Sequence, residues 1–279
     1  MATLRETILE SVAKLSPVSD SANLDAELLL CHALKCTRAQ FYARSTEEMP
    51  NSNFEELLAR RLKREPIAYI LGEWEFFSLP LNVRPPTLVP RPETEHLVEL
   101  ALELLPHENC RALDIGTGTG CIPIAVVCNH EHIRFTASDI KANNLTLAAE
   151  NAELNGVSER ICFIQSDLFD TIGDVDPFDL ITSNPPYVPD PAWPGLSDDI
   201  RLYEDRDALL SGEEGLDLIR KIIPQAAEYL KPEGHLLLEI GAEQADAVSV
   251  LLEENGYNDI SFRKDLAGID RIAMGRKPR

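Results

Sequence analysis

The sequence has few cysteines and histidines, and neither type falls at a spacing that builds a site. Its six cysteines include no Cys-x-x-Cys pair, and its six histidines lack metal-ligand spacing, so we expect no metal. Single cysteines within apolar patterns are typical of a reducing, cytoplasmic compartment. Apolar runs of bilayer-spanning length are missing, as is the apolar core of a signal peptide, so we expect no membrane partner.

Basic residues are also scarce. The 279 residues contain 26 lysines and arginines against 47 aspartates and glutamates, which gives a formal net charge of −21. Sequence-independent binding to a phosphate backbone needs a basic surface, so this balance argues against direct contact with nucleic acid. The basic run Arg60-Arg61-Leu62-Lys63-Arg64 is a candidate patch, but a solvated helix face explains it better.

The apolar pattern changes along the chain and predicts two domains joined by a linker. Over residues 1–72 apolar side chains such as Leu4, Ile8, Val12 and Leu15 recur at helical spacing. We expect a helical domain there that holds a substrate or partner, with a purely structural cap as the alternative. Residues 73–91 are β-prone and predict a hairpin linker, and residues 92–279 form the larger domain.

The larger domain alternates strands and helices, which predicts an α/β fold with a doubly wound sheet. Strands are expected at residues 111–115, 133–139, 161–165, 178–183, 235–240, 259–263 and 271–275, and helices at 121–128, 145–155, 216–230 and 242–254. In such a fold ligands bind at the carboxyl ends of the strands.

A glycine-rich turn follows the first of these strands. It consists of Gly116, Thr117, Gly118, Thr119 and Gly120. Glycines allow a tight turn and close approach of a ligand to the backbone, and the helix that follows offers unpaired N–H groups. Dinucleotide enzymes share this layout, but their GxGxxG spacing needs glycine where Cys121 stands. Together with a tetrapeptide described below, the spacing favours S-adenosylmethionine over a dinucleotide.

Two carboxylates close the next two strands and are expected at the same edge of the sheet. Asp139 is placed to accept both ribose hydroxyls of a nucleoside. Asp167 could accept the exocyclic amine of adenine, while Leu168 or Phe169 covers the ring.

The tetrapeptide Asn184-Pro185-Pro186-Tyr187 is the most informative stretch of the chain. It follows an apolar run that ends a buried strand. The prolines make the backbone rigid and leave carbonyl oxygens free, Asn184 adds an amide oxygen, and Tyr187 adds an aromatic face. Such a cluster suits the methylation of a planar NH2 group, although a plain proline-rich turn is the simpler alternative.

These features resemble the class I S-adenosylmethionine-dependent methyltransferases, and further motifs resemble the HemK/PrmC family. The family-like segments are Gly72-Glu73-Trp74-Glu75-Phe76, Leu88-Val89-Pro90-Arg91-Pro92-Glu93-Thr94-Glu95, and Asp265-Leu266-Ala267-Gly268 with Arg271. The resemblance implies a Rossmann-like sheet of seven strands in residues 92–279, with the helical domain in front of it.

The resemblance also implies an activity, a partner and a set of site residues. The reaction would be methylation of the side-chain N5 of glutamine in the Gly-Gly-Gln motif of class 1 peptide chain release factors, with the helical domain helping to hold the release factor. We expect the Asn184 oxygen and the Pro185 carbonyl to accept hydrogen bonds from the two N–H groups of the glutamine amide, while Tyr187 stacks on that amide. Asn184 would also adjoin the cofactor, and Pro186 the substrate.

Three alternatives remain open at this point. The same tetrapeptide serves methyltransferases of N6-adenine and N2-guanine, a ribosomal protein could supply the glutamine, and a non-catalytic cofactor-binding module is conceivable. The chain also departs from the family pattern at Asp205, where relatives usually carry proline, and at Leu168, where some have tryptophan.

Overall fold

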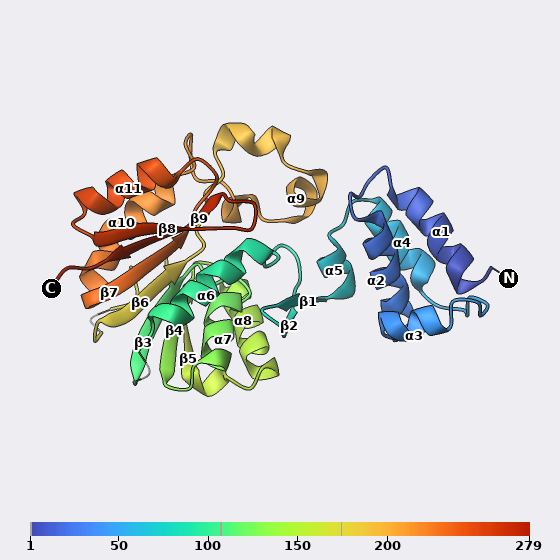
Figure 1. Cartoon of the computed structure of the whole chain (residues 1–279), viewed down its shortest axis with the longest axis horizontal. Coiled ribbons are helices and arrows are strands. Elements are labelled where there is room, and N and C mark those ends of the chain that lie inside the picture. Colours follow the sequence, from blue (N-terminus) through green and yellow to red (C-terminus); the bar gives the residue numbers. More distant parts are fainter. Residues whose placement is uncertain (1, 107, 174) are drawn as a thin grey trace. The chain divides into compact units, whose positions relative to one another are not determined.

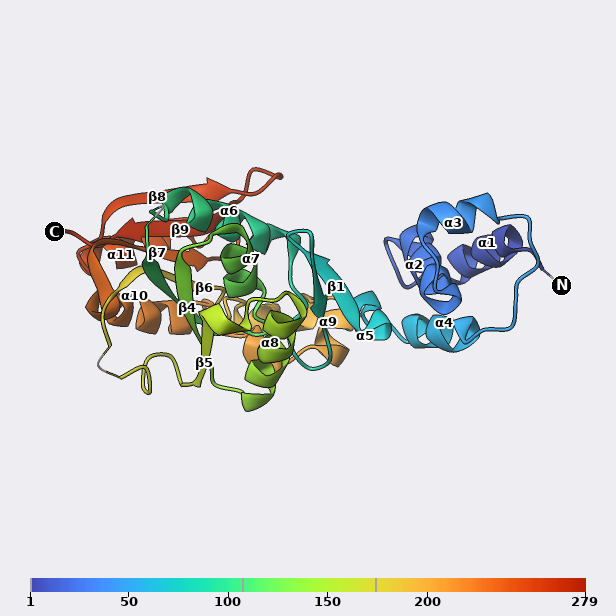
Figure 2. The same cartoon turned by 90° about the horizontal axis from the view of Figure 1, so that it is seen from below.

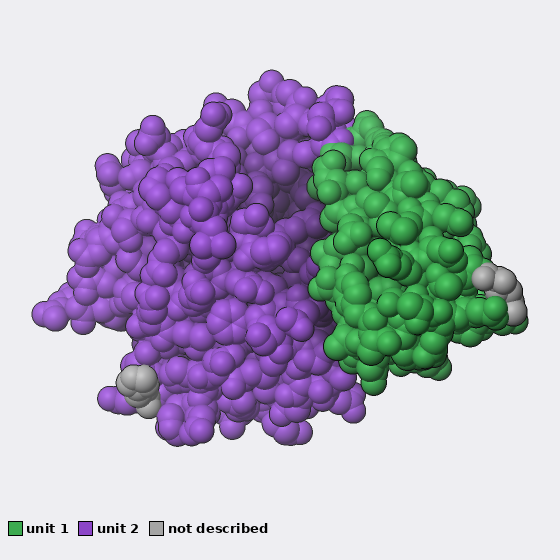
Figure 3. Space-filling view, turned by 45° about the vertical axis from the view of Figure 1, so that its right-hand side comes forward, with its two compact units in different colours: residues 1–73, 197–203 green, residues 74–196, 204–279 purple. Residues whose placement is uncertain are grey.

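The computed structural model describes residues 2–106, 108–173 and 175–279, and the chain forms two compact units. The first contains residues 1–73 and 197–203, and the second contains residues 74–196 and 204–279 (Figure 3). The first unit has one cluster of buried apolar side chains and the second unit has two, so each unit is described separately.

The first unit is a helical bundle, as its apolar spacing indicates. Its helices are α1 (Leu4–Leu15), α2 (Ala22–Leu34), α3 (Arg38–Ala43), α4 (Phe54–Leu62) and α5 (Ile67–Leu71), shown in Figure 1. Thr3 and Thr37 begin α1 and α3 with capping boxes, in which each hydroxyl accepts a hydrogen bond from a first-turn N–H. Leu4, Leu29 and Phe54 are among the buried apolar side chains that pack between these helices.

A short segment from later in the chain completes this unit. Helix α9 (Asp198–Tyr203) lies within residues 197–203. The Tyr203 hydroxyl donates to the Lys63 carbonyl at 3.0 Å, and Asp198 pairs with Arg64 at 3.3 Å. The basic run at the end of α4 therefore supplies partners for α9, and the sequence pattern did not separate this segment from the rest of residues 92–279.

The second unit is built on the expected seven-stranded sheet. Its order is β5-β4-β3-β6-β7-β9-β8. The strands are β3 (Cys110–Ile115), β4 (Ile133–Asp139), β5 (Ile161–Gln165), β6 (Phe178–Ser183), β7 (Leu230–Glu239), β8 (Asn258–Lys264) and β9 (Asp270–Arg276). The first five of these strands are parallel to one another, whereas β9 is antiparallel to both β7 and β8.

Helices cover both faces of this sheet, as Figures 1 and 2 show. They are α6 (Glu95–Leu104), α7 (Cys121–Asn129), α8 (Ala142–Leu154), α10 (Asp217–Tyr229) and α11 (Ala245–Glu254). Ala112 belongs to the cluster formed with α6, α7 and α8, and the next residue, Leu113, belongs to the cluster formed with α10 and α11. This alternation along one buried strand confirms the doubly wound α/β fold.

The predicted hairpin is present as a two-stranded sheet of β1 (Glu73–Phe76) and β2 (Leu79–Asn82). Several boundaries differ from the sequence prediction by one to five residues, and local structure explains two of them. Strand β7 begins at Leu230 rather than at residue 235. The residues that resemble a turn in the sequence form a bulge within the strand, where Glu233 has a φ of 66°. Helix α11 begins later than residue 242, because Gly241 N–H donates to the Gln244 side chain and forms a turn instead.

No helix of the described residues has the length and apolarity required to cross a bilayer.

Candidate active site

A cavity of about 290 Å³ lies in the second unit, at the carboxyl ends of the central strands. The chain runs outward from β3 through β4 to β5 and then returns to the other side of β3 as β6. At such a reversal the loops leave the sheet in opposite directions and open a crevice. The expected site residues that line it are Gly116, Thr117, Gly118, Thr119, Asp139, Asp167, Leu168, Asn184, Pro185 and Pro186.

The glycine turn forms one wall of this cavity. Gly116, Gly118 and Gly120 have φ values of 72°, 55° and 79°, which is the left-handed region that favours glycine. A Cβ at Gly116 or Gly118 would meet no atom within 4 Å, whereas one at Gly120 would lie 3.0 Å from the Ala148 Cβ. The first two glycines therefore face the cavity, and Gly120, which does not line it, lets the turn pack against α8.

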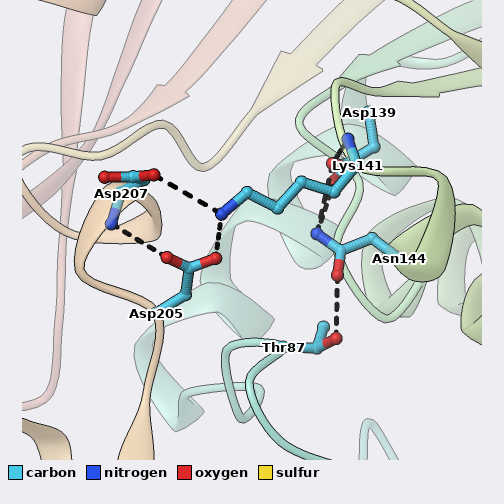
Figure 4. A network of polar contacts seen from close by, with 6 residues as sticks. All are labelled: Thr87, Asp139, Lys141, Asn144, Asp205 and Asp207. Carbon is cyan, nitrogen blue, oxygen red and sulfur yellow. Dashed lines mark hydrogen bonds and ion pairs between the residues drawn. The ribbon is translucent and has the colours of Figure 1, made fainter.

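Asp139 is held at the cavity wall by three neighbours. Its carboxylate accepts hydrogen bonds from Gly118 N–H at 2.9 Å, from Lys141 N–H at 2.8 Å and from Asn144 Nδ2 at 3.1 Å. The Thr87 hydroxyl donates to Asn144 Oδ1 at 2.8 Å and so turns the Asn144 amide nitrogen toward Asp139 (Figure 4). The carboxylate is therefore oriented by groups that also adjoin the cavity.

An ion pair lies at the same cavity, and its side chains are drawn in Figure 4. The Lys141 ammonium group pairs with Asp205 and lies 3.7 Å from an Asp207 oxygen. All three side chains line the cavity. Asp205 thus has a charged partner beside Asp139.

Asp167 and Leu168 follow β5 and both line the cavity. Leu168 has a φ of 48°, an uncommon conformation for a residue with a branched side chain. Phe169, the other candidate to cover a ring, is instead buried in the core, where it stacks on Tyr229 at 5.0 Å between ring centroids. Leu168 is therefore the apolar side chain that this turn presents to a ligand.

The tetrapeptide lines two adjacent cavities. Asn184, Pro185 and Pro186 line the large cavity and also a second one of about 30 Å³, to which Tyr187 contributes. The arrangement places a carboxamide and proline carbonyls where a cofactor-sized space meets a smaller one. A molecule bound in the large cavity and a second molecule bound in the small cavity would meet at these groups.

A buried carboxylate supports the tetrapeptide. Glu239, at the end of β7, is 1% exposed and accepts hydrogen bonds from Thr94 Oγ1 at 2.6 Å and from Tyr187 Oη at 3.0 Å. Asn184 Nδ2 donates to Thr94 Oγ1 at 3.2 Å. Burial raises the pKa of Glu239, and its hydrogen bonds from the two hydroxyls oppose that rise.

Arg91 is a second charged group beside the tetrapeptide. It lines both cavities and pairs with Glu204 at 2.6 Å, and the Glu204 side chain is 1% exposed. A buried partner distinguishes this pair from an ordinary surface ion pair.

Sequence reasoning named Arg91 and Thr94 only as part of a family motif and missed Glu239. The signal for Glu239 was a carboxylate placed directly after the apolar run Leu236-Leu237-Leu238 at the end of a predicted buried strand. A charged residue at that position faces the same sheet edge as the other strand ends.

The groups around the large cavity of the second unit fit S-adenosylmethionine. Gly116 and Gly118 leave open space where a Cβ would stand, and Asp139 offers an oriented carboxylate for ribose hydroxyls. Among the described residues no group of three or more histidine, cysteine, aspartate or glutamate side chains could hold a metal ion.

Comparisons with known proteins agree on one family. Residues 6–72 match the family described as PrmC N-terminal domain, and residues 95–193 match the Methyltransferase small domain. The chain is 40% identical over 263 residues to a release factor glutamine methyltransferase of Nitratidesulfovibrio vulgaris, covering 92% of this chain and 89% of that protein. It is 42% identical over 262 residues to the protein of that name from Vibrio cholerae, covering 92% and 91%.

A solved structure has a fold similar to that of this chain. A methyltransferase from Pyrococcus furiosus has a TM-score of 0.55 at 19% identity, covering 73% of this chain and 91% of that one.

Proposed function

The chain belongs to the release factor glutamine methyltransferase family, and from this premise we propose that it methylates the side-chain N5 of glutamine in the Gly-Gly-Gln motif of class 1 peptide chain release factors. The methyl donor is S-adenosylmethionine. The observation that carries the proposal is the position of Asn184 and Pro185, which line both the large cavity and the small one.

The large cavity suits the donor. S-adenosylmethionine, when bound, supplies an electrophilic methyl group on a sulfonium. Asp139 would accept the ribose hydroxyls, Asp167 the adenine amine, and Leu168 would cover the ring. Gly116 and Gly118 would let the amino-acid tail approach the backbone.

The tetrapeptide would then hold the acceptor. A glutamine amide nitrogen is a weak nucleophile because its lone pair is delocalised into the carbonyl. The Asn184 side-chain oxygen and the Pro185 carbonyl accept its two N–H bonds, which orients the nitrogen toward the methyl group. The Tyr187 ring, fixed by the hydrogen bond from its hydroxyl to Glu239, stacks on the amide plane.

The transfer needs no general base before the reaction. The amide nitrogen forms a bond to the methyl carbon as the carbon–sulfur bond breaks, the bonding electrons stay on sulfur, and one amide proton leaves to water. Positioning and hydrogen bonding supply the acceleration.

We further propose that the helical domain, residues 1–72, contacts the release factor, and that the protein acts in the cytoplasm, where that partner is used. Cross-linking of the active protein to a release factor, followed by mass spectrometry, should give cross-links from α1–α5 (residues 4–71). Cross-links confined to residues 92–279 would contradict this role.

The activity itself is tested by mass spectrometry of a release factor after reaction. One methyl group should appear on the glutamine of the Gly-Gly-Gln motif. Incubation of labelled cofactor with a cell extract, with and without nuclease, separates the alternatives: label on a ribosomal protein or on nucleic acid would overturn the proposal.

Asn184→Ala tests the role of the carboxamide. Loss of one preorganised hydrogen bond at a reacting group typically costs about 100- to 1,000-fold in turnover. We expect a loss of that order with little change in cofactor affinity, and Asp139→Ala should show the opposite bias. Equal losses of turnover and affinity in Asn184→Ala would mean that Asn184 only supports the cofactor cavity.

A further inference from the structure

We propose that Thr94 and Glu239 are positioning residues that fix which end of the Asn184 carboxamide faces the reacting group, so that the site selects an NH2 group over a carboxylate. This inference rests on the proposed glutamine transfer and concerns the same site. It assigns a role to two residues that lie far from the tetrapeptide in the sequence.

The geometry is a chain of three side chains in the second unit. Glu239 and Thr94 are each 1% exposed, and their contact is the 2.6 Å hydrogen bond from Thr94 Oγ1 to Glu239 Oε2. Thr94 Oγ1 is also 3.2 Å from Asn184 Nδ2. The carboxylate therefore reaches Asn184 through a single hydroxyl.

The number of protons makes this chain directional. A hydroxyl has one proton to donate, and both Glu239 carboxyl oxygens accept, one from Thr94 and one from Tyr187, as an ionised carboxylate does. Because the Thr94 proton goes to Glu239, Thr94 Oγ1 can only accept from Asn184. The NH2 end of the carboxamide must face Thr94, and Oδ1 is left as the end available to a substrate.

The directed carboxamide is selective for the chemistry of the acceptor. Asn184 Oδ1 and the Pro185 carbonyl can each take an N–H, so together they match a primary amide. A carboxylate in the same position would bring oxygen against oxygen with no proton between them. A rotated Asn184, with NH2 toward the small cavity, would lose this preference.

The Glu239 carboxylate that binds Thr94 also binds Tyr187, the aromatic residue of the site. Its Oε1 accepts from the Tyr187 hydroxyl at 3.0 Å, and Gln244 Nε2 donates to the Tyr187 carbonyl at 3.0 Å. The ring that stacks on the substrate and the amide that binds it are thus oriented by one buried group. Glu239 lines neither cavity and acts through Thr94 and Tyr187, whereas Thr94 borders the large cavity and acts in this scheme through Asn184.

Substitution of Thr94 tests the direction of the carboxamide. Thr94→Val keeps the branched shape and removes the hydroxyl, whereas Thr94→Ser keeps the hydroxyl. We expect Thr94→Val to lower kcat on a release factor about 10- to 100-fold, as for loss of a buried hydrogen-bond partner. Cofactor affinity should change less than about threefold, and Thr94→Ser should restore most of the turnover. Thr146→Val on the exposed face of α8 is the matched control and should behave as wild type.

Selectivity is a readout that a merely structural role would not move. Release-factor fragments with Gly-Gly-Gln and Gly-Gly-Glu compete with the substrate, and wild type should be inhibited far more strongly by the glutamine form. Thr94→Val and Glu239→Gln should lower the ratio of the inhibition constant of the Gly-Gly-Glu fragment to that of the Gly-Gly-Gln fragment. An unchanged ratio in both, a kcat like wild type in Thr94→Val, or an equal loss of cofactor affinity would overturn the inference.

A spectroscopic measurement separates this inference from the proposed function. The Asn184 side-chain NH2 signal in a nitrogen–proton spectrum can be assigned by its loss in Asn184→Ala. It should shift in Thr94→Val and stay near its wild-type position in Thr94→Ser, whatever the substrate is. A wild-type protein that methylates no release factor would sink the proposed function, and an unmoved NH2 signal in Thr94→Val would sink the positioning role.

Discussion

The glycine turn offers a prediction in which two alanine substitutions two residues apart have opposite consequences. Gly118 lines the cavity, and a Cβ there would meet no atom of the protein within 4 Å. Gly120 does not line the cavity, and a Cβ there would lie 3.0 Å from Ala148 Cβ, 3.1 Å from Ile124 Cδ1 and 3.3 Å from Ala148 Cα. Gly118→Ala should therefore impair ligand binding, and Gly120→Ala should impair the fold.

The stability changes can be estimated from these contacts. Both glycines have positive φ, and an alanine in that region costs about 1–2 kcal/mol. Gly118→Ala should cost no more than this. Gly120→Ala adds overpacking against side chains of α7 and α8 that are fully buried, which typically costs about 1–3 kcal/mol more. Its total of about 2–5 kcal/mol is a large part of the stability of a domain of this kind.

The binding changes should run the other way. The alanine methyl group at Gly118 would occupy space beside the Asp139 carboxylate, to which the Gly118 N–H donates. We expect S-adenosylhomocysteine to bind about tenfold more weakly or worse, which corresponds to about 1.4 kcal/mol. Folded Gly120→Ala should bind within a few-fold of wild type.

Urea unfolding followed by circular dichroism gives the first quantity, and titration calorimetry gives the second. Measurement of both on both variants makes each the control for the other. Equal stability losses in the two variants, or a greater loss of affinity in Gly120→Ala than in Gly118→Ala, would refute the division of roles within the turn.

Three further predictions concern other parts of the second unit. Asp114 is completely buried, and burial raises the pKa of its carboxyl to about 7. A raised carboxyl pKa contributes stability that is present at low pH and lost as pH rises toward 7, so urea unfolding should show Asp114→Asn gaining stability relative to wild type between pH 5 and pH 8. Lys141→Met breaks the pair with Asp205 at the cavity, and calorimetry should show S-adenosylhomocysteine bound about two- to fivefold more weakly, with less effect at high salt. Asn151 is fully buried and binds the backbone of β2 and of the glycine turn, so Asn151→Leu should lower the free energy of unfolding by about 2–5 kcal/mol, whereas the more exposed Asn155→Ala should cost about 1 kcal/mol or less.

Local patterns were enough to predict the seven-stranded α/β fold and the elements around the site. The glycine turn and Asp139 were predicted to face one cavity because parallel strands end at a common edge, and the structure brings them together there. Local patterns did not give the start of β7, where a bulge imitates a turn, or the grouping of residues 197–203 with the helical unit. A bulge and a long-range packing choice depend on partners that short-range periodicity does not contain.

The sequence by itself determined the chemical groups of the site. The Asn184 carboxamide and the Pro185 carbonyl follow β6, the glycine turn follows β3, and the Asp139 carboxylate ends β4. These are properties of contiguous residues, whose turn geometry and hydrogen-bonding groups are local. The tertiary structure alone decided how the carboxamide is oriented. Thr94 and Asn184 are 90 positions apart and Thr94 and Glu239 are 145 apart, and they meet only because β7 lies beside β6 and α6 begins at the same edge of the sheet.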